Sequence, residues 1–341
     1  MSRYLVTGGA GFIGSHLTEA LLRAGHRVRV LDDLSSGVRP ADPAVEFLEG
    51  DVADATLVRR AVEDCAGIFH LAAMTAEARC QEGWSRSHAV NLGGTIAVLD
   101  AARAAGRIPV CFASSAAIYG EQGPRAIQEA ARPRPHGHLG ADKLGAEHHA
   151  ALAFAQHGVP NLGLRIFHAY GPRAEGHRRD VVAIFAERIL AGQVITLHGD
   201  GQQVRDFVHV SDVVRHFFAG MQMLQLQPQA LALNLCTGRG TTLRGLADLM
   251  GVVAARVPLV QFGPRRPQDL RALLGDPNEA IHVLGVEAAT DLETGLRTLF
   301  PAPPPSALEW ARRAPMPRPP RAGIGPAPAA GMGGRALHHP G

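Results

Sequence analysis

The sequence has no long hydrophobic run and almost no lysine. A helix that crosses a membrane needs about 20 consecutive apolar residues, and no stretch of the 341 residues approaches that length. The first residues enter a strand-like run at once, without the layout of a signal peptide. We therefore expect a cytoplasmic protein with no membrane partner.

Cysteine and net charge are also low. The spacing of the four cysteines is not that of metal ligands, so we expect reduced, packed thiols and no metal site: Cys65, Cys80, Cys111 and Cys236. The net charge is +3, and residues 301–341 alone carry five arginines and one glutamate, or +4, which leaves −1 for the rest. The charge outside residues 301–341 therefore does not indicate a basic surface that would bind nucleic acid.

Lys143 is the only lysine, so 33 of the 34 lysines and arginines are arginine. Arginine is a planar, permanently charged group, whereas lysine is a compact ammonium whose pKa responds to its surroundings. A solvated surface lysine is the ordinary explanation for one such residue. The motifs around Lys143, described below, favour a chemical role instead.

The first 170 residues alternate strand-like and helical runs. Strands are expected at 4–7, 27–31, 45–48, 67–71 and 109–113, and helices at 12–23, 54–64, 88–105 and 139–157. This alternation predicts an α/β fold with right-handed crossovers and a doubly wound parallel sheet. Further helices near 180–191, 211–225, 243–254 and 291–299 alternate with short strands, which predicts a smaller mixed C-terminal lobe.

A glycine-rich turn joins the first strand to the first helix. The spacing Gly8-x-x-Gly11-x-x-Gly14 allows a tight turn and brings the helix N-terminus against a pyrophosphate. Asp32 ends the second strand, where a carboxylate can bind both ribose hydroxyls and would repel a 2′-phosphate. No arginine adjoins it in the sequence, so NAD is favoured over NADP as cofactor.

These features predict three regions. Residues 1–170 form an NAD-binding Rossmann domain to which some later segments return, and residues 171–300 form mainly a substrate lobe. Residues 301–341 are rich in Pro, Gly, Ala and Arg and are expected to be disordered, apart from a short helix at 306–313.

Several segments between residues 3 and 300 resemble the extended short-chain dehydrogenase/reductase superfamily, in its NAD-dependent epimerase/dehydratase branch. They are the glycine turn, Ser-Ser-Ala-Ala-Ile-Tyr-Gly at 114–120, Asp-Lys-Leu-Gly-Ala-Glu at 142–147, and Gly-Asp-Gly-Gln-Gln-Val-Arg-Asp-Phe at 199–207. The resemblance implies an NAD site made by Gly8, Gly11, Phe12, Ile13, Gly14, Asp32, Asp51, Val52, Leu71, Ala72, Asn91 and Lys143.

The resemblance also implies the reacting groups. Ser115 would hydrogen-bond the substrate hydroxyl that is oxidised, and Lys143 would bind the nicotinamide ribose and activate a tyrosine four residues before it. Leu139 stands at that tyrosine position, and leucine cannot exchange a proton. General acid–base catalysis contributes roughly 10²–10⁴-fold, so a substitute matters. His138 and His136 are the candidates, with Tyr119 and Asp142 nearby.

On the substrate side, the resemblance implies that Arg205 and Arg266 grip the diphosphate of a nucleotide-diphospho-sugar, a task suited to the arginine fork. His168 replaces an asparagine that contacts the sugar nucleotide in the family. Ala116 and Ala117 stand where its dehydratases carry Asp-Glu, which argues against 4,6-dehydration.

The leading hypothesis is therefore an NAD-dependent epimerase that oxidises C4 of a nucleotide sugar transiently. One alternative is an NAD-binding pseudoenzyme or partner subunit without turnover. Another is a nucleotide-sugar dehydratase or oxidoreductase that uses a different base. A homodimer through the helices near 88–105 and 139–157 is a further hypothesis.

Overall fold

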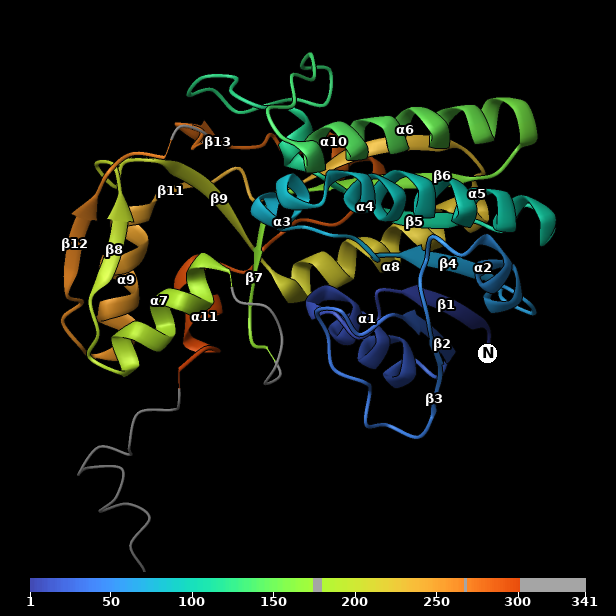
Figure 1. Ribbon diagram of the computed structural model, residues 1–341, viewed down its shortest axis with the longest axis horizontal. Helices are drawn as coiled ribbons and strands as arrows, with labels where there is room; N and C mark the ends of the chain where they lie inside the picture. The colour runs from blue at the N-terminus through green and yellow to red at the C-terminus, as the bar shows by residue number, and fades with distance from the viewer. Residues whose placement is uncertain (174–179, 267–268, 301–341) are drawn as a thin grey trace, which may run out of the picture. The chain divides into compact units, whose positions relative to one another are not determined.

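The computed structural model describes residues 1–173, 180–266 and 269–300, and residues 1–301 belong to one compact unit. The expected tail at 301–341, with its short helix at 306–313, lies outside the described residues. The architecture confirms the predicted α/β class, with a parallel sheet between helices (Figure 1).

Seven parallel strands form the main sheet in the order β10-β6-β5-β4-β1-β2-β3. All five predicted strands are present, to within two residues at either end, as β1 (Arg3–Thr7), β2 (Arg27–Asp32), β3 (Val45–Glu49), β4 (Gly67–His70) and β5 (Val110–Ser115). The remaining two are β6 (Asn161–Ile166) and β10 (Ala230–Leu235). From β1 the strands that follow in sequence lie first on one side of it and then on the other. The carboxyl ends of the strands at this reversal form a crevice typical of dinucleotide sites.

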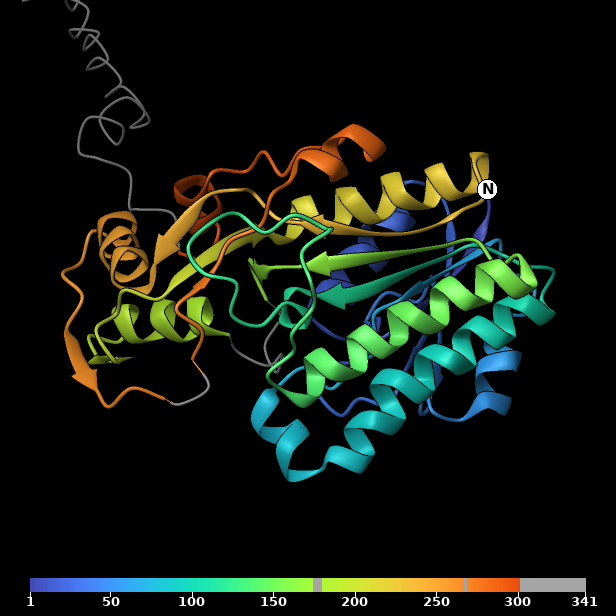
Figure 2. The same cartoon turned by 90° about the horizontal axis from the view of Figure 1, so that it is seen from above.

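Helices cover both faces of this sheet (Figure 2). On one face α1 (Phe12–Arg23) packs against α8 (Val210–Leu226), and on the other α5 (Gly94–Ala104) packs between α2 (Ala55–Ala61) and α6 (His138–His157). The helix predicted at 88–105 contains a π-helical turn, η1 (Ala89–Gly93), which joins α4 (Trp84–His88) to α5. A further short helix, α3 (Glu77–Glu82), precedes α4. Each face has its own apolar core.

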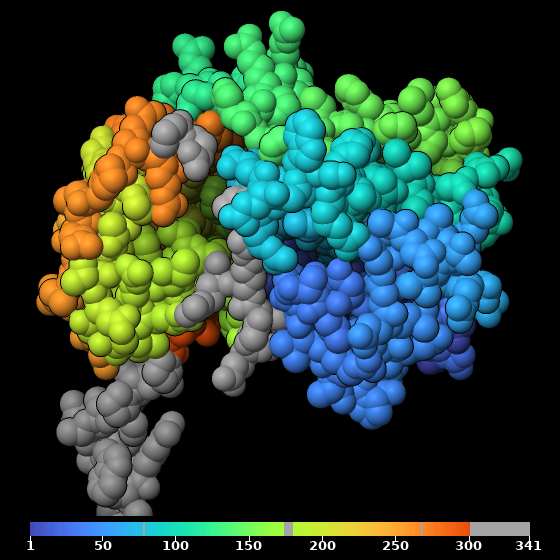
Figure 3. Space-filling view, in the orientation of Figure 1, coloured from blue at the N-terminus to red at the C-terminus, as the bar shows by residue number. Residues whose placement is uncertain are grey.

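The C-terminal part builds a smaller mixed lobe, as expected. Strand β9 (Val204–His209) pairs with β7 (His168–Tyr170), β11 (Gly240–Thr242) and β13 (Ala272–Leu273), while β8 (Ile195–His198) pairs with β12 (Val260–Gly263). Helices α7 (Val181–Leu190), α9 (Leu243–Ala254) and α11 (Leu292–Arg297) enclose a third core. Figure 3 shows this yellow-green and orange lobe beside the blue and cyan part.

Three later segments return to the main sheet. Helix α8 covers one face, strand β10 forms the edge beside β6, and α10 (Asn278–Leu284) packs on β10 and α8. The division at residue 170 stays a prediction. All four cysteines are buried and unbridged, as expected. No helix in the described ranges has both the length and the apolar character to cross a membrane, and the same residues hold no metal-binding cluster.

Candidate active site

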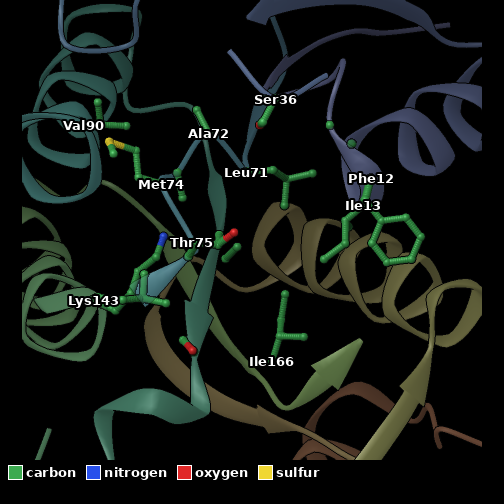
Figure 4. Close-up of a pocket in the computed structure, with 18 of the residues that line it drawn as sticks. Phe12, Ile13, Ser36, Leu71, Ala72, Met74, Thr75, Val90, Lys143 and Ile166 are labelled. Atoms are coloured by element: carbon green, nitrogen blue, oxygen red, sulfur yellow. The ribbon is translucent and has the colours of Figure 1, made fainter. Parts of the chain in front are cut away.

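A cavity of about 690 Å³ opens at the carboxyl ends of β1 to β6. Its wall includes the glycine turn, the ends of β2 and β5, the segment after β4, and side chains from α6 (Figure 4). Of the residues expected to bind NAD, all but Asn91 line this cavity. Ser115 and His168, expected on the substrate side, line it too.

The glycine turn is shaped for close approach. Gly8 has φ of +70°, and a Cβ there would lie 2.5 Å from Ala72 N. A Cβ on Gly14 would lie 2.1 Å from the Gly8 carbonyl oxygen, so neither position admits a side chain. Gly11 is the N-cap residue before α1, and no side chain of the described residues caps this helix. Its first N–H groups therefore suit an anionic phosphate of a dinucleotide.

The carboxylate of Asp32 is held in place beside this turn. Its Oδ2 accepts from Ala10 N at 3.0 Å and its Oδ1 from Leu34 N at 2.9 Å. These bonds fix the acid at the end of β2, where a ribose would lie.

Arg86 of α4 reaches the same end of the cavity. It donates to Asp51 Oδ2 and lies 3.5 Å from Asp33 Oδ2. Burial raises the pKa of Asp51, but the bonds from Arg86 and Ala53 outweigh burial and hold it below its usual range. No local pattern marks Arg86, because the three residues are distant in sequence.

A buried polar column lies under the cavity. Ala72 N donates to Thr7 Oγ1 at 3.3 Å, and Thr7 Oγ1 lies 2.7 Å from His70 Nδ1. Thr95 Oγ1 lies 3.0 Å from His70 Nε2 and gives its own proton to Asn91 O at 2.8 Å. His70 Nε2 must therefore carry the proton and Nδ1 must accept. Burial, with the charge of Lys143, lowers the pKa of His70 to about 3.

Asn91 supports the cavity wall. Its Oδ1 accepts from Met74 N at 2.8 Å, and its Nδ2 donates to Met74 O at 3.1 Å. Met74 itself lines the cavity, whereas Asn91 does not. A direct contact between Asn91 and the cofactor therefore stays a prediction.

Ser115, Lys143 and Leu139, the residues expected at the reacting centre, all line the cavity. Ser115 Oγ accepts from Ala117 N at 3.1 Å, which leaves its hydroxyl proton to be donated elsewhere. Lys143 is 3% exposed, and Figure 4 shows its amine pointing into the cavity, across from Phe12 and Ile13. Burial lowers the pKa of Lys143 to about 8, against the opposing charges of Asp142 and Glu147.

Glu147 anchors α6 and so positions Lys143 one turn earlier. Its Oε1 accepts from Ser114 Oγ at 2.5 Å, and its Oε2 accepts from Arg165 Nη2 at 2.8 Å. Arg165 Nη1 continues to Tyr119 Oη at 2.8 Å. This buried network ties the helix to β5 and β6.

The candidate histidines lie apart from the cavity. The ring of His138 packs edge-on against Trp84, with ring centres 5.3 Å apart, and the backbone N–H of His138 donates to Glu77 Oε1 at 2.9 Å. His136 is exposed, and neither histidine is among the lining residues. A proton-transfer role for His138 stays a prediction, and its side-chain placement does not favour it.

Tyr119 and Asp142 are engaged elsewhere. The Tyr119 hydroxyl donates to Asn234 Oδ1 at 2.7 Å, and burial raises its pKa to about 12. Asp142 accepts from Ser87 Oγ at 3.3 Å and contacts His88 Nδ1 at 3.0 Å. Neither residue lines the cavity.

Of the four residues expected to bind substrate, Ser115 and His168 line the cavity, whereas Arg205 and Arg266 do not. His168 lines the cavity, and burial, with the charge of Arg205, lowers its pKa to about 3, so its ring is neutral. Arg205 donates to Val204 O at 2.8 Å, and Arg266 Nη2 lies 2.7 Å from His198 Nε2. Neither arginine is among the lining residues.

The model of the NAD dependent epimerase/dehydratase family matches residues 4–236. The chain belongs to this family. A UDP-glucose 4-epimerase of Mycolicibacterium smegmatis is 34% identical over 86% of this chain and 96% of its own length.

Two solved structures are also similar. The UDP-glucose 4-epimerase of Thermotoga maritima with UDP-glucose is 33% identical, with a TM-score of 0.81, and covers 87% of this chain and 97% of its own. The Thermus thermophilus UDP-glucose 4-epimerase complex with NAD is 35% identical, with a TM-score of 0.79 and the same coverage. The glycine turn and Asp32 fit the same dinucleotide, and the cofactor of this protein is NAD.

Proposed function

We propose that the protein is an epimerase that acts on a nucleotide-diphospho-sugar by transient oxidation at C4, with an altered acid/base site. The observation that carries this proposal is one cavity that joins the glycine turn to Ser115, Lys143 and His168. The 4-epimerase relatives support the substrate class.

Each part of the cavity has a task in this reaction. The N–H groups at the start of α1 hold the pyrophosphate, Asp32 holds the adenosine ribose, and Lys143 faces the nicotinamide ribose. NAD, when bound, supplies the reversible two-electron oxidation of the sugar carbon. Ser115 Oγ, which accepts from Ala117 N, donates its proton toward the substrate oxygen and orients it.

The diphosphate is assigned to Arg205 and Arg266. Arg205 lies on β9, and β9 pairs with β7, the strand that begins at His168. The positive charge of Arg205 lowers the pKa of the His168 ring. A bound diphosphate would draw both guanidinium groups toward the cavity, because arginine binds phosphate through paired N–H bonds.

Dehydration is disfavoured as the main activity. Ala116 and Ala117 both line the cavity at the positions where dehydratases of the family carry Asp-Glu. Elimination of water needs an acid and a base near the leaving hydroxyl, and methyl groups supply neither.

The second candidate is an NAD-binding pseudoenzyme. Leu139 favours it, because this side chain lines the cavity at the position of the family's tyrosine and has no proton to exchange. A binding subunit needs the fold and the cofactor but not a base.

A substrate panel separates the two candidates. The protein, Leu139→Tyr and the size-matched control Leu139→Ile are each incubated with UDP-, dTDP- and GDP-sugars, and epimer formation and NADH absorbance are followed. We expect turnover of at least one sugar, a gain of at least roughly tenfold for Leu139→Tyr, and no gain for Leu139→Ile. The added ring could cost about 1–3 kcal/mol of stability by overpacking, so folding is checked by melting. NAD binding without turnover in all three proteins would favour the pseudoenzyme.

A homodimer through α5 and α6 is also part of the proposal. The two helices pack together, and each exposes a large apolar side chain: Ile96 is 38% exposed and Leu152 is 49% exposed. Light scattering should give the mass of a dimer, and Leu152→Glu should give a monomer. A monomeric native protein would contradict this part.

A further inference from the structure

Among the described residues that line the cavity, Lys143 is the one that combines an amine directed into the cavity with a proton it can release near neutral pH. The lining carboxylates are occupied at other points. Asp32 accepts from the glycine turn, Asp33 from Ser35, Asp51 from Arg86, and Asp180 from Arg173 at 2.5 Å. Asp180 also caps α7.

His168 is a poor proton acceptor as well. Its buried ring stands close enough to Arg205 for that guanidinium to lower its pKa further, to about 3. An imidazole with that pKa holds a proton weakly and would not retain one taken from a sugar hydroxyl at neutral pH.

The geometry of Lys143 suits a proton acceptor. Its side chain leaves α6 one helical turn after Leu139, so the two share a face. The stem is buried and the amine points into the cavity (Figure 4). A lysine with a pKa near 8 is roughly half neutral at pH 8, whereas an ordinary lysine is less than about 1% neutral there.

We propose that Lys143 itself is the acid/base of this site and that its Nζ removes and returns the proton of the substrate hydroxyl beside Ser115. This inference rests on the proposed epimerase function and deepens it. The resemblance to the family assigns Lys143 only to the nicotinamide ribose and to the activation of a tyrosine that this chain lacks.

The step balances. The sugar O–H bond breaks and an N–H bond forms on the neutral amine, while the C–H electron pair reduces the dinucleotide and the carbon becomes a ketone. On return, one ammonium proton goes back to the oxygen as the C–H bond re-forms on the other face. Lys143 gains one positive charge as the dinucleotide loses one, so the net charge of the cavity does not change.

The surrounding charges set the pKa of this amine from several elements. Asp142 and Glu147 on α6 raise it, and burial lowers it more. Other titratable groups lie on the elements that pack against α6 or near the amine. Most are held in other contacts: His70 with Thr7 and Thr95, Arg165 with Glu147, His88 with Asp142, Glu77 with His138 N, Arg86 with Asp51, and Arg103 with Asp100. Arg79 of α3 lines the cavity with Arg86.

The single lysine makes a direct test possible. Protein grown on lysine carrying carbon-13 at Cε gives one lysine signal, so the titration of Lys143 can be followed by NMR without assignment and without NAD. We expect a midpoint near pH 8. A midpoint of 10 or above would overturn the proposal whatever the activity.

Two variants then separate proton transfer from charge. Lys143→Arg keeps a cation that does not release its proton, and Lys143→Met removes both charge and proton. If Lys143 is the acid/base, both variants should lose at least roughly 100-fold in kcat, while calorimetry shows that Lys143→Arg still binds NAD. The kcat of the native protein should rise with pH through a midpoint that tracks the NMR midpoint.

The outcomes distinguish this inference from the proposed function. Turnover by the native protein with Lys143→Arg within tenfold of it would overturn the acid/base assignment and leave the epimerase intact. No turnover by the native protein or by Leu139→Tyr on any sugar, with NAD bound, would overturn both.

Discussion

Replacing Glu147 with glutamine should destabilise the protein by about 3 kcal/mol, the lower end of the range for breaking a buried ion pair. The Glu147 and Arg165 side chains are 8% and 10% exposed, so little water is present to take over the lost contact. The glutamine amide would also face Arg165 with N–H groups, which cannot accept the guanidinium protons.

The same substitution should act on Lys143. The Glu147 charge raises the pKa of Lys143, so its removal should move the NMR midpoint of the amine below pH 8. The Arg165 side chain should remain in place, because it keeps its bonds to Tyr119 Oη and to Glu129 O at 2.9 Å.

Urea unfolding checks the magnitude, with the denaturant slope compared to show that the unfolded state is unchanged. The matched control is Asp248→Asn, which removes the acid of an exposed Arg244 pair on α9 and should cost less than about 1 kcal/mol. Equal losses in Glu147→Gln and Asp248→Asn would refute the buried network as the anchor of α6.

Three further predictions follow from the cavity. Asp32→Ala should weaken NAD binding and narrow its preference over NADP, measured by calorimetry; equal NAD and NADP affinity in the native protein would contradict the role of this carboxylate. Gly14→Ala should abolish NAD binding because its Cβ would lie 2.1 Å from Gly8 O, whereas Gly83→Ala, with 3.7 Å to its nearest neighbour, should retain it. The pKa of Lys143 falls from 10.5 to about 8 on folding. Between these two pH values the unfolded state binds more protons than the folded state, so stability must rise with pH. The unfolding free energy of the native protein, relative to that of Lys143→Met, should therefore rise by about 3 kcal/mol over this pH range; if urea titrations show the same difference between the two proteins at every pH, the pKa is not lowered.

Most of the nucleotide-binding half was predictable because its strands are short apolar runs. Strand β6 was not predicted, since Asn161, Gly163 and Arg165 are unusual in a central strand. Each is accommodated by a distant partner: Asn161 Nδ2 donates to Ala150 O at 2.8 Å, Arg165 pairs with Glu147, and a Cβ on Gly163 would lie 2.7 Å from the Phe112 ring. Such partners are fixed by the fold and leave no local pattern.

The residues of the candidate site likewise fall into those that could be predicted from local sequence and those that could not. The glycine turn and Asp32 could be placed because their chemistry depends on neighbours in sequence. The contact of Arg86 with Asp51, and the turn of His138 toward Trp84, depend on where α4 packs. A loop histidine near the reacting end could therefore be proposed from sequence, but its direction could not.

The hydrogen bonds from Ala72 through Thr7 and His70 to Thr95 all run in one sense. Because the pKa of His70 is about 3, its ring keeps one proton on one nitrogen throughout the range in which Lys143 titrates. The charge and the hydrogen-bond direction of this buried polar column therefore stay constant over that range. A change in turnover between pH 7 and pH 9 would then report the protonation of the Lys143 amine and not a change in the column.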